Sequence, residues 1–167
     1  MERTWNYFFY STLKLQILLG DLLFQKPIYF IILNVFPFLR KNEAKGLKEY
    51  KKVMNNKDYG FNIGFAFGFM FLTTMIIYTS ICLYLVKLLN LEVGDAIYYY
   101  FIVIVVLSYA TNYLFLYRAD TYRKYFDEFE KTSSKSLIYP SAILFHLGIF
   151  GFGILSIHWT VGFILNP

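Results

Sequence analysis

The residues with the greatest capacity for chemistry are polar side chains set within apolar segments. His146 and His158 both lie in 136–167, a stretch without Asp, Glu, Lys or Arg. An ionisable residue inside a membrane segment is a functional candidate, and histidine can carry a proton or bind a metal. The two are about 18 Å apart along a straight helix, so they cannot share one metal ion. We expect His146 to take part in proton movement or in a hydrogen-bonded contact, and His158 to lie at the membrane interface.

Three further polar residues raise the same question. Asn112 is costly to bury unpaired in lipid, so it should meet a partner on another helix. Lys14 and Asp21 lie on one face of the apolar N-terminal segment, and they must face protein or water if that segment crosses the membrane. Copies arranged in a ring would then line a channel with them. If the segment lies flat, they face the cytosol. We list the candidate intramembrane polar or pore-lining residues as Lys14, Asp21, Asn112 and His146.

These residues do not form a recognisable catalytic set. The sequence has no nucleophile motif with a workable histidine, no HExxH and no glycine-rich phosphate loop before a lysine. A membrane enzyme needs a nucleophile, an acid and a base that converge. Cys82 is the single cysteine, which leaves no intrachain disulfide and no cysteine-rich metal site. We predict a protein that is not an enzyme and that has no cofactor and no bound metal.

The elements that hold the polar residues are predicted membrane helices. Three stretches, 60–86, 96–117 and 136–167, carry no charged side chain, and about 20 apolar residues are enough to cross a bilayer. Only 16% of the chain is charged, against roughly 25% in soluble domains. We predict an all-α membrane protein, a polytopic bundle forming a single integral membrane domain over 1–167. Its clear membrane segments lie at about 61–86, 96–117 and 137–164.

The N-terminal region 7–39 is a fourth apolar segment, but charges and Pro27 interrupt it. Proline breaks or kinks a helix, and the apolar run after it is too short to span alone. Two arrangements fit: one kinked crossing, or an interfacial helix followed by a short re-entrant segment. We favour the crossing, which gives four membrane segments.

The basic residues predict the orientation. Of the sixteen Lys and Arg residues, seven lie in 40–58 and five in 118–135, whereas only Lys87 lies between the charge-free stretches 60–86 and 96–117. The positive-inside rule then places 40–58 and 118–135 in the cytoplasm, and 87–95 and the C-terminus outside. We predict a multi-pass protein of the cell (inner) membrane. The net charge of +5 serves topology and contact with anionic lipid, so we expect the lipid bilayer and no nucleic acid as a partner.

Both cytoplasmic segments have the periodicity of amphipathic helices. Aromatic and apolar residues recur at helical spacing as follows: Leu47, Tyr50 and Met54 in the first segment, and Tyr122, Tyr125, Phe126 and Phe129 in the second. The second pattern predicts that the helix of the membrane segment 96–117 continues beyond the membrane to about Lys131. We predict two short helices whose aromatic faces pack together beneath the membrane.

Gly60, Gly64 and Gly68 form a doubled GxxxG motif at the start of the 61–86 segment. Glycines four apart lie on one side of a helix and allow another backbone to approach closely. Packing within one subunit is the commoner use of such a seam. Joining protomers, in some cases around a pore, is the use that would carry function.

Together these patterns predict a non-enzymatic integral membrane protein that acts by assembly, as a homo-oligomer or with a membrane or cytoplasmic protein. One version is a small pore-forming or membrane-perturbing effector, such as the membrane arm of a toxin or antiviral defence system. Another version is an accessory protein. The alternatives are a small transporter or membrane enzyme that uses the intramembrane polar residues, or a docking subunit for a cytoplasmic partner.

Overall fold

A computed structural model describes residues 1–25, 35, 43–56, 60–90, 97–132 and 134–165 of the chain. These residues form six α-helices and no strand. Three helical stretches are long and apolar enough to cross a membrane. They are α4 (Phe61–Leu88), α5 (Ile97–Asn112) with the π-helix η4 (Tyr113–Tyr117), and α7 (Lys135–Leu165). The predicted helical class is therefore confirmed, and each of the three clear segments forms a helical stretch that could cross a membrane.

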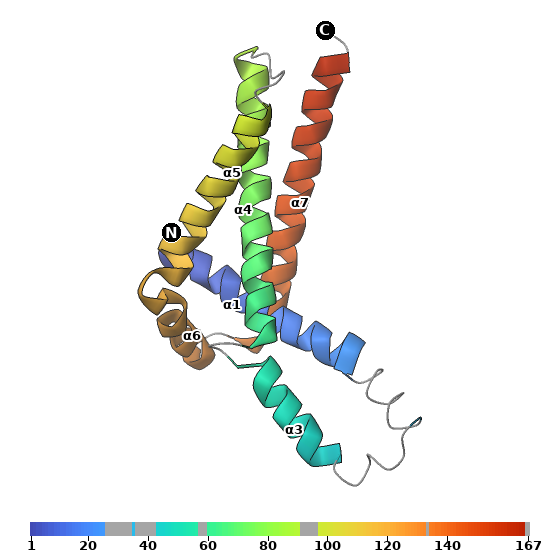
Figure 1. The fold of residues 1–167 in the computed structure, drawn as a ribbon, viewed down its shortest axis with the longest axis vertical. Helices are drawn as coiled ribbons and strands as arrows, with labels where there is room; N and C mark the ends of the chain where they lie inside the picture. Colours follow the sequence, from blue (N-terminus) through green and yellow to red (C-terminus); the bar gives the residue numbers. More distant parts are fainter. Residues whose placement is uncertain (26–34, 36–42, 57–59, 91–96, 133, 166–167) are drawn as a thin grey trace.

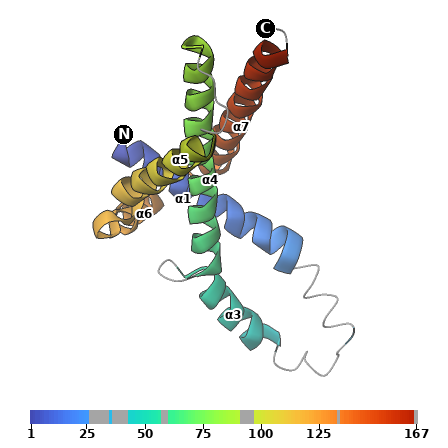
Figure 2. The ribbon, with the colours of Figure 1, turned by 45° about the horizontal axis from the view of Figure 1, so that its top comes forward.

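The three spans stand on a base of shorter helices, which Figure 1 shows below them. The base consists of α1 (Glu2–Leu19), α3 (Glu43–Met54) and α6 (Thr121–Thr132). α1 runs across the lower ends of α4 and α7 and packs against both. Away from the base α4 and α7 diverge, as the tilted view in Figure 2 also shows. The base and the spans therefore meet where α1, α4 and α7 come together.

The predicted fourth membrane segment, 7–39, is not among the candidate spans of the described residues. Its described part is α1 followed by the π-helix η1 (Gly20–Gln25), and α1 crosses beneath the spans rather than running alongside them (Figure 1). Residues 26–34 and 36–39 lie outside the described residues, so a crossing through them stays a prediction. The direction of α1, across the ends of the spans, agrees with the arrangement in which the N-terminal helix lies at the interface.

Aromatic side chains hold α6 against α1. Phe9 of α1 and Phe126 of α6 are fully or almost fully buried, at 0% and 1% exposed, with ring centroids 5.3 Å apart. Tyr122 lies 5.9 Å from the Phe9 ring. α3 instead contacts α4 and, in the described part of the chain, makes no contact with α6. Helices form in both predicted cytoplasmic segments. Within the described part α6 packs on α1 and not on α3; the side chains of Leu47 and Tyr50 lie outside that part, so the contact predicted for them stays a prediction.

A turn between α5 and α6 explains this difference. After η4 the chain forms a short 3₁₀ segment, η5 (Arg118–Asp120), and Asp120 has a φ of 53° in the left-handed region. Aspartate tolerates this conformation better than most residues, and the left-handed conformation changes the direction of the chain. Asn6 Nδ2 of α1 donates to the Phe115 carbonyl just before the turn, at 2.8 Å. The predicted continuous helix to Lys131 is therefore wrong, and the turn places the aromatic face of α6 on α1.

Candidate functional site

His146 lies at the junction of α1, α4 and α7 and is 9% exposed. Its Nε2 is 2.8 Å from Thr12 Oγ1 of α1, and its Nδ1 is 3.3 Å from Thr73 Oγ1 of α4. The rings of Phe69 and Phe145 lie 5.6 and 5.2 Å from the imidazole, between centroids. A single side chain of α7 thus connects the base to a span through two hydroxyl groups.

The hydroxyl protons in this cluster are already engaged. Thr12 Oγ1 donates to the Phe8 carbonyl at 2.7 Å. Thr73 Oγ1 donates to the Phe69 carbonyl at 2.8 Å. Because a hydroxyl has one proton, both threonine oxygens face His146 as acceptors. A neutral imidazole has one N–H, so the shorter contact favours a proton on Nε2 and leaves Nδ1 as a bare acceptor facing another acceptor.

This geometry predicts unequal effects of two matched substitutions. Thr12→Val removes the acceptor of a buried N–H and is expected to cost about 1–3 kcal/mol of unfolding free energy at neutral pH. Thr73→Val removes a group that the bare Nδ1 does not need, so its cost should be well below that of Thr12→Val. Unfolding in detergent, followed by circular dichroism, measures both. Equal losses, or a larger loss for Thr73→Val, would show that Nε2 does not carry the proton.

Asn112 is 3% exposed and lies between α5 and α4. Its Nδ2 donates to Thr74 Oγ1 on α4 at 2.8 Å and to the Ser108 carbonyl at 2.9 Å. Tyr78 and Thr111 form a second polar contact between the same helices, with hydroxyl oxygens 2.7 Å apart. The Asn112 Nδ2 therefore has the predicted partner on another helix, whereas its Oδ1 is buried without a hydrogen-bond partner in the described part of the chain.

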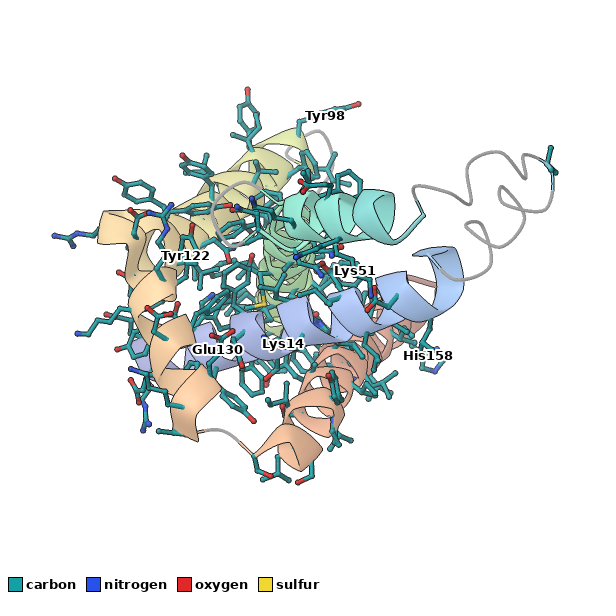
Figure 3. All side chains as sticks on the ribbon, turned by 90° about the horizontal axis from the view of Figure 1, so that it is seen from below. Lys14, Lys51, Tyr98, Tyr122, Glu130 and His158 are labelled. Atoms are coloured by element: carbon teal, nitrogen blue, oxygen red, sulfur yellow. The ribbon has the colours of Figure 1, made fainter. Side chains whose placement is uncertain are left out.

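Lys14 and Asp21 lie at the base and form ion pairs with neighbouring helices. Lys14 Nζ is 3.1 Å from Glu130 of α6, and the two residues meet on the lower face in Figure 3. Asp21 accepts from Lys51 of α3 at 3.5 Å. Exposed ion pairs each contribute less than about 1 kcal/mol to the free energy of unfolding. These pairs therefore show which helices are neighbours, but they add little to stability. All four candidate pore-lining residues, Lys14, Asp21, Asn112 and His146, have at least one partner within the subunit, and a pore-lining role for them stays a prediction.

The three seam glycines have two different environments. A Cβ at Gly60, the N-cap of α4, would clash with backbone atoms of Met54 and Asn56. Gly64 and Gly68 have no atom within 4 Å of a Cβ position. Close packing within the subunit is therefore found at Gly60, where the chain enters α4. Gly64 and Gly68 are not packed against any other described part of the subunit.

Sequence reasoning missed the contribution of α1 to the polar cluster. Thr12 and the fully buried Asn6 lie on a helix whose pattern drew attention to Lys14 and Asp21. A single threonine in an amphipathic segment carries no signal of its own, and His146 lies 134 positions from Thr12. His158 is exposed on the far part of α7. Among the described residues, no group of three His, Cys, Asp or Glu side chains could hold a metal ion.

The described residues thus contain a buried histidine in contact with two threonine hydroxyls, a polar contact between two candidate spans, ion pairs at the base and two glycines with an open side. No protein-family model, curated protein or solved structure matches the chain.

Proposed function

We propose that this protein is a non-enzymatic multi-pass membrane protein that acts by assembling with copies of itself through α4. The observation that carries the proposal is the open side of Gly64 and Gly68. Glycine within a helix costs about 1 kcal/mol relative to alanine. Two glycines with no neighbour on a predicted lipid-facing surface therefore need a reason, and close approach by another helix supplies one.

The residues around these glycines have the shape of a packing surface. Phe61 and Phe65 are 58% and 53% exposed, and Leu72 is 52% exposed, so bulky exposed side chains lie near the glycines in the sequence of α4. Two copies related by a two-fold axis would each present the same surface, and the bulky residues of one copy would lie against the glycines of the other. Lipid tails are as apolar as the helix surface, so the hydrophobic effect does not drive helices together in a membrane. Close van der Waals packing of this kind drives the association instead.

The base of the molecule is assigned to the cytoplasm. Lysine and arginine residues concentrate in 40–58 and 118–135, and such loops remain inside. α1 shares this location because Arg3 and Lys14 pair with Glu128 and Glu130 of α6. We therefore infer three crossings by the described helices, with α1 in the cytoplasmic interface, in place of the kinked crossing that the sequence favours.

An accessory or scaffolding role fits this assembly better than a channel. Lys14 and Asp21 are paired at the base, outside the candidate spans, and Asn112 and His146 make hydrogen bonds between helices of one subunit. Pore formation, a toxin or antiviral role, transport, catalysis and docking of a cytoplasmic partner stay predictions from the sequence.

The test compares the seam with an equally open glycine elsewhere. Gly64→Leu and Gly68→Leu together are expected to weaken self-association about tenfold or more, because overpacking of a tight contact costs about 1–3 kcal/mol. Gly148→Leu on α7 is the matched control, since its Cβ position is also open. Light scattering in mild detergent gives the mass, and energy transfer between labelled copies in liposomes gives the affinity. A monomeric wild-type protein, or equal loss with Gly148→Leu, would contradict the proposal.

A further inference from the structure

Two buried polar atoms at the contact between α4 and α5 have no hydrogen-bond partner among the described residues. They are the Ser108 hydroxyl oxygen and the Asn112 Oδ1. Ser108 is 0% exposed and Asn112 is 3% exposed. Both residues lie in a candidate span, as does their neighbour Thr74 on α4. The two atoms are therefore enclosed by protein within the hydrocarbon region, where bulk water does not reach them.

The neighbours of the Asn112 amide fix its orientation. Its Nδ2 lies 2.8 Å from Thr74 Oγ1 and 2.9 Å from the Ser108 carbonyl oxygen. Thr74 Oγ1 donates its one proton to the Phe71 carbonyl at 2.7 Å, so toward Asn112 it can only accept. The Ser108 carbonyl is also an acceptor. Exchange of the amide nitrogen and oxygen would break both hydrogen bonds, so Oδ1 needs a donor from elsewhere.

The Ser108 hydroxyl lies close to this unpaired oxygen. Residues four apart on a helix share one face, and their Cβ atoms are about 5–6 Å apart. One water molecule with hydrogen bonds of about 2.8 Å can join two atoms that are up to about 5.5 Å apart. Buried polar groups that lack a protein partner are commonly satisfied by such a water molecule. The alternative, a buried polar group with no partner, weakens folding by about tenfold or more.

We propose that Ser108 and Asn112 bind one water molecule between α4 and α5. The water donates one proton to Asn112 Oδ1 and forms its second hydrogen bond with the Ser108 hydroxyl, which can donate or accept. A metal cation does not fit the same two atoms, because cations that prefer oxygen ligands are held by more of them. The site lies within one subunit, so it does not depend on the self-association of α4.

Infrared spectroscopy tests the presence of this water directly. Films of the full chain in lipid are compared in ordinary water and in water labelled with heavy oxygen. The O–H stretching band of a bound water shifts with the label, whereas the band of a serine hydroxyl does not, because its oxygen does not exchange. The wild type should have a shifting band that Ser108→Ala lacks. Ser156→Ala is the matched control and should keep the band, because Ser156 Oγ donates to the Phe152 carbonyl of its own helix at 2.8 Å.

Unfolding in detergent provides a second test, because the sign of the effect depends on the water. If the water is bound, Ser108→Ala removes one of its hydrogen bonds and should raise the unfolding equilibrium constant about fivefold. If no water is bound, the substitution removes an unpaired buried hydroxyl and should lower that constant instead. Ser156→Ala measures the effect of a serine-to-alanine change in a span apart from the water.

Two results would overturn the proposal. One is the same shifting band in wild type and in Ser108→Ala, or no such band in either. The other is an unfolding constant that falls in Ser108→Ala relative to Ser156→Ala. Circular dichroism shows whether each variant is folded, and the search for a shifting band in the wild type needs no substitution.

Discussion

Replacing Phe126 with alanine is expected to lower the free energy of unfolding by about 3–5 kcal/mol. Phe126 is 1% exposed, and its ring lies 5.2–5.6 Å from the rings of Tyr10, Phe9 and Tyr122, between centroids. The base lies outside the candidate spans, so water is the solvent of the unfolded α6. Loss of the ring therefore removes hydrophobic burial and leaves a cavity between α1 and α6.

The matched control is Phe101→Ala on α5, where the ring is 59% exposed. An exposed substitution of this kind should change the unfolding free energy by about 0.5 kcal/mol or less. Chemical unfolding in detergent measures both variants. Limited trypsin digestion adds a local test, because release of α6 should speed cleavage after Arg123 and Lys124. Equal destabilisation by the two substitutions would mean that α6 is not docked on α1.

The spans were predictable because the cost of a charge in lipid is a local property of the sequence. A run such as 96–117 without a charged residue needs no knowledge of its neighbours to be placed in a membrane. The same reasoning identified Asn112 as a group that needs a partner. It did not identify Thr74 as that partner, since the choice depends on how α4 and α5 cross.

The contacts of α6 and of the charged residues on the N-terminal segment also depended on partners that the sequence did not identify. The spacing of aromatic residues in 121–132 predicted which face of α6 is buried, but it could not predict which helix packs against that face. The left-handed Asp120 turns α6 toward α1, and one such backbone angle has no periodic signal. Lys14 and Asp21 were read as a stripe along a single helix, whereas Glu130 and Lys51 meet them from two other helices. The sequence identified these polar residues, but it did not identify the residues with which they pair.

The His146 cluster shows why the base matters to the spans. Thr12 belongs to α1, which packs on α6, while Thr73 and His146 belong to spans. A change that moves α1 would alter the contact between Thr12 and Nε2 without altering the contact between Thr73 and Nδ1. Base and spans are therefore joined by a contact between single polar atoms, as well as by apolar packing.

Alkaline pH is expected to destabilise the protein through Tyr10. Burial, with a further contribution from the negative charge of Glu130, raises the pKa of Tyr10 from 10.0 to about 12. Below about pH 10 the tyrosine is neutral in both the folded and the unfolded chain, so it has no effect on stability. Between about pH 10 and 12 the unfolded chain loses the proton and the folded chain keeps it, so unfolding becomes more favourable as pH rises.

The size of this effect follows from the shift. Two pH units correspond to roughly 3 kcal/mol of stability lost by about pH 12. Tyr10→Phe removes the ionisable group and keeps the ring, which is 3% exposed. The difference in unfolding free energy between wild type and Tyr10→Phe should therefore stay constant up to about pH 10 and then change by this amount in favour of the variant.

Urea unfolding in detergent at about pH 9 and about pH 12 measures that difference, and other tyrosines cancel because both proteins contain them. Glu130→Gln tests the second cause, because loss of its charge should move the onset of the folded-state titration of Tyr10 to lower pH and reduce the alkaline loss. A constant difference across the range would mean that Tyr10 is open to solvent. α1 would then be detached from α6, and the assignment of α1 to the same cytoplasmic base would fail with it.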